Sequence, residues 1–368
     1  MRNVMSLIKK FLVPSLIVSI SILIALIMFE VGLRLITKDD GWEIPTELNF
    51  LRNFDYNYSI KGLYEAPVDV VEYSRNEFGL RDNCHEPSLI RILTIGGSTT
   101  DLKYVSLNDA YQTVLGNLIS SYVGQEVCVS NAGIDGHSTY GNLATFKYWL
   151  PLIPNLNPEY VLLYIGVNDA QLLRHMRGDY GVSRIKLLLK MKLYLVQRLL
   201  PFYRYVRDSF FDNERDLYTN HKPAHYTAND YVVSKLHDNV EPLTVVNTAG
   251  FRDRLETILG NISNMGAKPI CVTQPHRFIM EIRGQTLGIP NVMAADFSGL
   301  DFDYSIRSLN NVMRELCGDN LIDLYSAPFN EEHFYDGVHT TAKGSRYIGQ
   351  MLYEGLLNGG KLTVFQQH

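Results

Sequence analysis

Short apolar runs alternate with longer amphipathic stretches along most of the chain. Each run holds four to six residues, mostly Val, Ile, Leu and Tyr, and turn-forming residues follow it, which is typical of buried β-strands. The expected strands are residues 91–95, 127–131, 160–165, 269–273 and 321–324. The expected helices are residues 107–122, 141–150, 251–265, 306–317 and 341–357. This alternation predicts an α/β fold with a central parallel sheet and helices on both of its faces.

Polar residues follow several of these strands at the point where the strand ends. Ser98, Gly133, Asn168 and Gln274 each come just after an apolar run. Right-handed crossovers place the loops that follow parallel strands at one edge of the sheet, where ligands bind in open α/β folds. We therefore expect these four residues to lie at that edge.

Ser98 has the local sequence of a reactive serine. Gly96 and Gly97 precede it and allow a sharp backbone turn beside its hydroxyl. A serine hydroxyl is a poor nucleophile at neutral pH unless a base accepts its proton and a third group orients that base. Asp336 and His339 supply such a pair, because side chains three positions apart can point the same way from a turn.

An acyl-transfer site also needs hydrogen-bond donors for the negative charge that develops on the carbonyl oxygen. We expect three donors: the backbone N–H groups of Ser98 and Gly133 and the side-chain amide of Asn168. Gly133 has no side chain to obstruct a substrate. This set of residues needs neither a metal nor an organic cofactor.

Four segments, in this order along the chain, resemble the SGNH hydrolases, also called the GDSL esterase and lipase superfamily. They are Gly96-Gly97-Ser98-Thr99, Asn131-Ala132-Gly133, Gly166-Val167-Asn168-Asp169 and Asp336-Gly337-Val338-His339. The resemblance spans about residues 88–357 and implies a flavodoxin-like three-layer sandwich with a central parallel five-stranded sheet. It also implies that Ser98, Asp336 and His339 are catalytic and that Ser98, Gly133 and Asn168 form the oxyanion hole. One departure is Gly97, where this family often has an aspartate.

Each segment alone has a simpler interpretation. Glycines mark turns, Asn-Asp caps helices and Asp-Gly forms turns. The segment Gly96-Gly97-Ser98-Thr99-Thr100 is also similar to a phosphate-binding loop, but it lacks the lysine of that pattern. Taken together, in one order and after strands, the segments favour the catalytic interpretation.

The amino-terminal region predicts one transmembrane helix. Residues 11–29 are 19 uncharged, mostly apolar residues, which is long enough to cross a bilayer. Arg2, Lys9 and Lys10 precede this stretch, and by the positive-inside rule they favour a cytoplasmic amino terminus with the rest of the chain outside the cytoplasm, periplasmic or extracellular. A cleaved signal peptide is the alternative, but no small-x-small cleavage site follows the stretch.

The expected organisation has three parts. Residues 1–38 form the cytoplasmic tip and signal anchor, residues 39–87 an extended linker, and residues 88–368 the catalytic domain, which contains a helical insertion at about 171–248. Within the linker, residues 76–82 look like a segment that often precedes the serine block in membrane-linked members of the family. A plain glycine turn explains that segment equally well.

The insertion contains a basic, leucine-rich stretch at residues 183–211. A membrane-surface helix or a substrate lid is one interpretation, and a helical hairpin that packs on the domain with its lysines extended to water is the other. The spacing leaves both open.

Composition excludes some functions and leaves others open. A net charge of −5 and an isoelectric point near 6.1 argue against nucleic acid as a partner. The four cysteines are too widely spaced for a metal site; Cys128 and Cys271 are expected to be small core residues, and a disulfide that involves Cys84 or Cys317 fits an oxidising compartment. His276, after Gln274 and Pro275, is either a pocket residue or, more simply, a satisfied loop residue.

The sequence therefore predicts a serine-dependent ester hydrolase that acts on acyl esters, with O-acetylated cell-surface glycans as the favoured substrate by resemblance. Alternatives of the same fold are an O-acyltransferase and a lysophospholipase-like lipid esterase. A further alternative, from another class, is a non-catalytic glycan-binding or assembly protein that keeps the fold as a scaffold. The expected partners are the acylated glycan or lipid and the membrane; the sequence names no protein partner.

Overall fold

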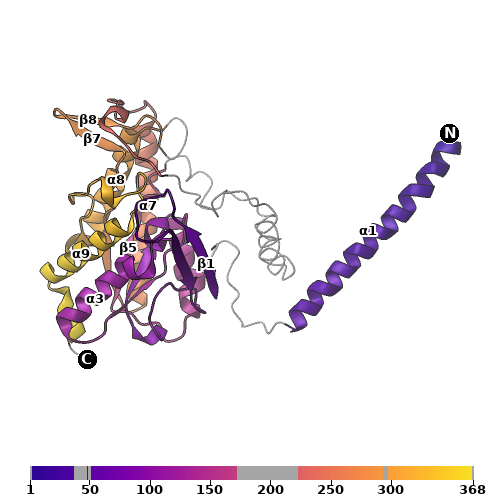
Figure 1. Ribbon diagram of the computed structural model, residues 1–368, viewed down its shortest axis with the longest axis horizontal. Coiled ribbons are helices and arrows are strands. Elements are labelled where there is room, and N and C mark those ends of the chain that lie inside the picture. Colours follow the sequence, from indigo (N-terminus) through magenta and orange to yellow (C-terminus); the bar gives the residue numbers. More distant parts are fainter. Residues whose placement is uncertain (1, 37–47, 49–50, 172–222, 293–296, 367–368) are drawn as a thin grey trace. The chain divides into compact units, whose positions relative to one another are not determined.

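The computed structural model describes residues 2–36, 48, 51–171, 223–292 and 297–366 (Figure 1). The described residues fall into two compact units, which we treat separately. The basic stretch expected at residues 183–211 lies outside the described residues.

The first unit contains helix α1, Arg2–Ile36, which runs without a break for 35 residues (Figure 1). Its segment Pro14–Gly32 has a mean hydropathy of 2.4, and its apolar side chains are exposed. By length and composition this is a candidate membrane span, and a signal sequence near an amino terminus would have the same properties.

The second unit is built around a five-stranded parallel sheet, as predicted. Its strands are β3 (Ile90–Gly96), β4 (Cys128–Asn131), β5 (Tyr160–Tyr164), β6 (Lys268–Val272) and β9 (Leu321–Ile322). Their order across the sheet is β4-β3-β5-β6-β9, which is the flavodoxin-like order 2-1-3-4-5. All five residues of β5 are buried, because helices cover both faces of the sheet.

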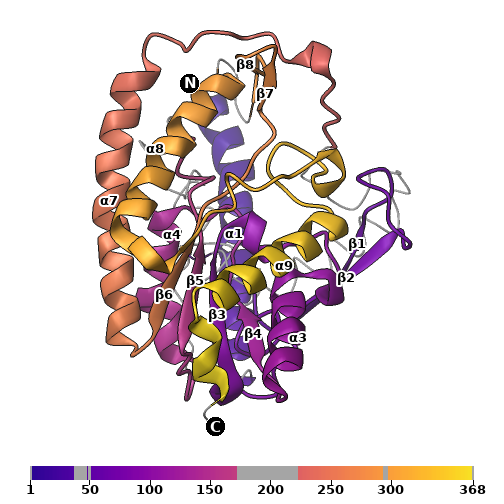
Figure 2. The ribbon, with the colours of Figure 1, turned by 90° about the vertical axis from the view of Figure 1, so that its left-hand side faces the viewer.

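Helices α3 (Tyr111–Val123) and α9 (Ala342–Asn358) pack together on one face, and α7 (Val240–Asn264) and α8 (Gly299–Cys317) pack together on the other (Figure 2). The resulting three layers agree with the predicted sandwich. The core between the sheet and the first helix pair contains Leu115, Ile119, Leu162, Ile348 and Leu352.

Helix boundaries differ from those expected where a helix begins with polar residues. Helix α7 begins at Val240 instead of 251, and α8 begins at Gly299 instead of 306. The first turn of α8 is closed by a capping box, in which Ser298 and Asp301 bond each other's backbone N–H groups, so it starts well before the apolar periodicity. The helix expected at 141–150 is instead a short helix α4, Thr139–Ala144, followed by a π-helical turn, Thr145–Trp149.

The range expected to be an extended linker contains an antiparallel strand pair, β1 (Phe54–Ser59) and β2 (Val70–Arg75). The pair belongs to the second unit, so from residue 48 onward the described chain packs as part of this unit. Its buried side is rich in tyrosine and contacts Tyr104 and Tyr335, two residues from loops near the carboxyl edge of the central sheet.

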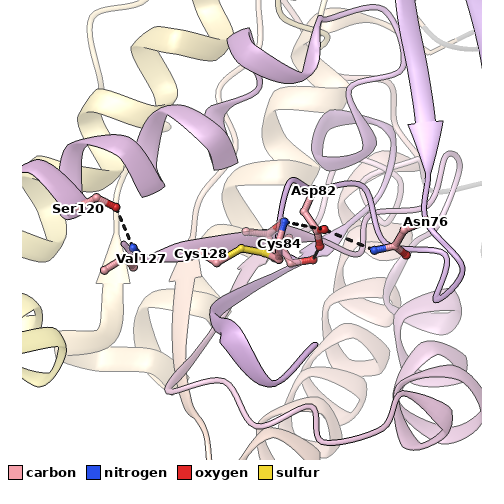
Figure 3. Close-up of a disulfide and its surroundings, with 8 residues drawn as sticks. Asn76, Asp82, Cys84, Ser120, Val127 and Cys128 are labelled. Carbon is pink, nitrogen blue, oxygen red and sulfur yellow. Dashed lines mark hydrogen bonds between the residues drawn. A yellow bond between two sulfur atoms is a disulfide. The ribbon is translucent and has the colours of Figure 1, made fainter. Parts of the chain in front are cut away.

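Two disulfides involve all four cysteines. Cys84 is bonded to Cys128, with Cα atoms 5.8 Å apart, and Cys271 is bonded to Cys317, with Cα atoms 6.2 Å apart. Cys128 and Cys271 are therefore not the free core residues that their apolar surroundings indicated. Figure 3 shows that the first disulfide joins the segment after β2 to the start of β4, beside Asp82.

Candidate active site

Ser98 lies at the turn between β3 and the four-residue helix α2, Ser98–Asp101. The chain can turn this tightly because residue 96 is a glycine, and the turn leaves no room there for a side chain. A Cβ atom there would lie 2.1 Å from Thr100 Oγ1 and 2.4 Å from the carbonyl oxygen of Tyr164. The glycine thus allows the helix to begin directly against strand β5, with Ser98 at its first position.

The structure brings Ser98, His339 and Asp336 into one hydrogen-bonded series. Ser98 Oγ lies 2.7 Å from His339 Nε2, and His339 Nδ1 lies 2.7 Å from Asp336 Oδ2. The second carboxylate oxygen, Oδ1, accepts hydrogen bonds from the backbone N–H groups of Val338 at 2.8 Å and His339 at 2.7 Å. The carboxylate is thereby held by the same turn that carries the imidazole.

Electrostatics keep Asp336 ionised in this position. Burial by itself would raise the pKa of Asp336, but the nearby His339 and hydrogen bonds from the His339 and Val338 N–H groups outweigh burial and lower it below its ordinary value. The ring of Tyr335 stacks on the imidazole at 5.7 Å between centroids. A negative carboxylate that is fixed in this way can hold the imidazole in one tautomer and stabilise its protonated form.

Asn168 lies beside the nucleophile turn and is nearly buried. Its Nδ2 donates to the carbonyl oxygen of His137 at 2.9 Å, which fixes the plane of the amide. The neighbouring Asp169 accepts from the Thr139 N–H and pairs with Arg254 of α7, and these contacts hold the loop on which His137 lies. The amide of Asn168 is therefore oriented by its bond to a loop that Asp169 holds in place.

Gly133 does not have the orientation that the sequence predicted. Its N–H donates to Asn131 Oδ1 at 2.8 Å, inside the loop, instead of pointing toward an oxyanion. The side of Gly133 where a Cβ would project is packed against helix α2, 2.6 Å from the Asp101 nitrogen. The glycine is required for this close approach, and its N–H is bonded within the loop.

Gly136 lies in the same loop and was not singled out from the sequence. It has φ +81° and lies in a turn closed by a 3.1 Å hydrogen bond from His137 N to Ile134 O. The residue after Gly136, His137, is where the loop meets the nucleophile turn, since a Cβ on Gly97 would lie 2.7 Å from the His137 carbonyl oxygen. The glycine-rich sequence around 133–136 was the signal for a close approach, but it did not distinguish the two glycines.

Position 97 shows why the aspartate common in the resembled family is missing here. A Cβ atom there would lie 2.6 Å from Asn168 Nδ2 and 2.7 Å from the carbonyl oxygen of His137. Any side chain would displace one of these groups. The glycine is therefore part of the arrangement that places Asn168 beside Ser98.

His276 is the satisfied residue that the simpler interpretation described, and Gln274, which was expected only to lie at the sheet edge, is also hydrogen-bonded. The side chain of His276 is 1% exposed and lies 3.1 Å from Asp303 Oδ1, while its Nδ1 accepts from the N–H of Phe278. Gln274 accepts a 3.1 Å hydrogen bond from Thr99. Among the described residues, no group of three or more His, Cys, Asp or Glu side chains is placed to hold a metal ion.

No protein-family model matches the chain, and no curated protein matches it in sequence. A comparison of structures does find similar proteins, and these include lipolytic hydrolases and esterases.

Three of these structures illustrate the likeness. An α/β hydrolase, LAE5, from the metagenome of Lake Arreo, Spain, is 14% identical, with a TM-score of 0.39 over 74% of this chain and 95% of its own. The acetyl xylan esterase AlAXEase is 15% identical, with a TM-score of 0.38 over 73% and 100%. A lipase/acylhydrolase from Enterococcus faecalis is 17% identical, with a TM-score of 0.38 over 74% and 97%.

Proposed function

We propose that this protein is a serine-dependent ester hydrolase of the SGNH type. The observation that carries the proposal is the hydrogen-bonded series from Ser98 through His339 to Asp336, which joins residues 241 positions apart in the chain. Its three groups are the nucleophile, base and orienting acid that hydrolysis through an acyl-enzyme requires.

In the proposed reaction, Ser98 Oγ attacks the acyl carbonyl carbon while His339 Nε2 takes the hydroxyl proton. The tetrahedral intermediate collapses, the bond to the leaving alcohol breaks, and His339 returns the proton to that alcohol. A water molecule then attacks the acyl-enzyme with His339 as the base, and the carboxylic acid leaves with Ser98 regenerated. Asp336 stays ionised throughout and stabilises the protonated imidazole.

Three donors would hold the oxyanion. Two are those expected, the backbone N–H of Ser98 and the side-chain amide of Asn168. We propose Gly136 N–H in place of Gly133 N–H, because the loop approaches Gly97 and Asn168 at the residue after Gly136, whereas Gly133 N–H points into the loop toward Asn131. Such donors act on charge that exists only in the transition state, so they raise kcat more than they change KM.

The favoured substrate is a short acyl ester, such as an O-acetyl group on a cell-surface glycan. A hollow of about 10 Å³ lies beside Ser98 and His339 and is lined by Leu102, Tyr104 and Val105. It has no room for a long acyl chain, which supports a short acyl group. Helix α1 supports a substrate made at or near the membrane, with the catalytic unit outside the cytoplasm.

The direct test is hydrolysis of p-nitrophenyl acetate, butyrate and octanoate by the full chain in detergent. We expect highest activity on the acetate, and a loss of at least about 1,000-fold in Ser98→Ala. Ser121→Ala is the matched control, since this serine is exposed and bonds only its own helix. Activity that survives Ser98→Ala contradicts the mechanism, and a wild-type protein inert toward every ester, with and without alcohol acceptors, favours the scaffold alternative.

The location has its own test. In sealed membrane vesicles of known orientation, we expect the full chain to resist alkaline extraction and the catalytic unit to be digested only by protease on the extracytoplasmic side. Extraction of the chain, together with a new amino terminus after residue 29, would instead identify α1 as a cleaved signal sequence.

A further inference from the structure

Two buried arginines lie beneath the candidate active site, and neither belongs to the catalytic series. Arg75 ends strand β2, and Arg81 follows six residues later; they are 5% and 1% exposed. Burial of a guanidinium group is costly unless its N–H groups are bonded and its charge is balanced. The contacts that compensate these two arginines are therefore informative.

Arg75 joins the nucleophile helix to the loop that follows β4. One terminal nitrogen donates both to Asp101 Oδ1, at 2.7 Å, and to the carbonyl oxygen of Gly133. The Nε atom donates to the hydroxyl of Tyr73 at 2.6 Å, and Tyr73 in turn donates to the same Asp101 oxygen at 2.6 Å. Asp101 is the last residue of the helix that Ser98 begins.

Arg81 holds the same carboxyl-terminal end of this helix. Its side chain donates to the carbonyl oxygens of Asp101 and Leu102, each at 3.0 Å, and to that of Val105 at 2.6 Å. The last carbonyls of a helix have no partners within the helix, so a four-residue helix depends on such external donors. The backbone N–H of Arg81 also donates to Asn131 at 3.0 Å, which ties this segment to the end of β4.

Arg75 also donates to the carbonyl oxygen of Gly79 in its own segment, but its remaining terminal nitrogen bonds two elements of the proposed site. This nitrogen of Arg75 bonds both Asp101, on the helix that carries the nucleophile, and Gly133, on the loop that carries a proposed oxyanion donor. It therefore bridges the two elements. The disulfide between Cys84 and Cys128 joins the segment that carries Arg81 to the start of β4 (Figure 3). A general stabilising role would not require that one guanidinium nitrogen bond both partners.

We infer that Arg75 is a positioning residue of the proposed hydrolase, which sets the distance between the nucleophile helix and the loop of residues 133–137 so that the oxyanion donors converge. This inference rests on the proposed function. The donors act on the transition state, so their misplacement lowers kcat with little change in KM.

The variants are Arg75→Lys and Arg75→Met. The lysine keeps the positive charge but cannot make the several hydrogen bonds of the planar guanidinium group, and the methionine removes the charge and the hydrogen bonds. For the full chain in detergent with p-nitrophenyl acetate, we expect kcat to fall about 100-fold in Arg75→Lys and further in Arg75→Met, with KM within about threefold of wild type. Arg91→Lys is the control, because Arg91 pairs with Glu159 at the far end of β3 and should leave kcat and KM unchanged. A folded Arg75→Lys protein with wild-type kcat overturns the inference, as does an equal loss in Arg91→Lys.

A second measurement does not depend on activity. Amide hydrogen exchange of the full chain should be faster at residues 133–139 in Arg75→Lys than in wild type, and unchanged in strand β6. Unchanged exchange at 133–139 in Arg75→Lys overturns the inference, whether or not the wild type is active. If exchange there is faster in Arg75→Lys but the wild-type protein hydrolyses no ester, the proposed function fails while the positioning contact stands.

Discussion

Addition of a single methyl group at position 97 should disable the site without replacing any residue of the proposed catalytic machinery. In Gly97→Ala the new Cβ would lie 2.6 Å from Asn168 Nδ2 and 2.7 Å from the His137 oxygen, distances at which a neighbour has to move. The His137 segment is held through Thr139 by Asp169, so the Asn168 side chain is the group that rotates. That rotation removes one oxyanion donor.

The magnitude follows from the number of donors lost. Removal of one oxyanion donor costs about 100- to 1,000-fold in kcat, and overpacking costs about 1–3 kcal/mol in the free energy of unfolding. The assay is hydrolysis of p-nitrophenyl acetate by the full chain, with thermal unfolding measured on the same samples. We expect kcat to fall by that factor while KM stays near wild type, and Gly97→Asp, which supplies the aspartate common in the resembled family, to be at least as impaired.

Gly260→Ala is the matched control. Position 260 is exposed on helix α7, and a Cβ there has no neighbour within 4 Å. It should leave kcat unchanged and raise the free energy of unfolding by about 0.5–1 kcal/mol. A Gly97→Ala protein that keeps wild-type kcat and a normal unfolding temperature would refute the reasoning, since Asn168 would then not need its present position.

Three further predictions follow from other contacts. Asp336→Asn should lower kcat by about 10,000-fold with little change in the unfolding temperature, because the imidazole loses the carboxylate that fixes its tautomer; stopped-flow ester hydrolysis and calorimetry measure the two quantities. Burial would raise the pKa of Asp301, but hydrogen bonds from His237 and Ser298 lower this pKa below its ordinary value. The ionised carboxylate therefore stabilises the fold above about pH 4, and this contribution is lost as the pH falls below that value. Asp301→Asn should lower the free energy of unfolding in urea at pH 7, and the difference from wild type should shrink toward pH 3. Replacement of Cys84 and Cys128 together by Ser should lower the free energy of unfolding by about 4 kcal/mol, because the disulfide closes a loop of 44 residues. Selective reduction of this disulfide in the wild type should lower the free energy of unfolding by the same amount. An unchanged free energy of unfolding would mean that the bond is not formed.

The central sheet was predictable from sequence because its strands are buried on both faces and therefore appear as unbroken apolar runs. Strands β1 and β2 do not have this property: their burial alternates, and their apolar side is formed by tyrosines such as Tyr58 and Tyr73, so the segment resembled a linker. The starts of α7 and α8 were missed for a related reason, because buried polar residues such as Asp301 and Thr244 interrupt the apolar period.

The residues proposed for catalysis were found because their chemistry requires particular residue types after strands. Two things about the site could not be read in this way. The choice between Gly133 and Gly136 depends on where the Asn131 side chain points, which only the folded loop determines. The roles of Arg75 and Arg81 were hidden because arginine is almost always exposed, so nothing in the composition of this segment indicated burial.

The separation of 241 residues between Ser98 and His339 also bears on how the protein is made. A ribosome that has synthesised the nucleophile, its helix and the arginines beneath it has not yet supplied the base, which follows 241 positions after the nucleophile. A nascent chain that stops before His339 therefore contains an unactivated serine alcohol. The enzyme proposed here would gain its reactivity only after residue 339 has been synthesised, so that shorter nascent chains cannot attack the esters of the cell that produces them.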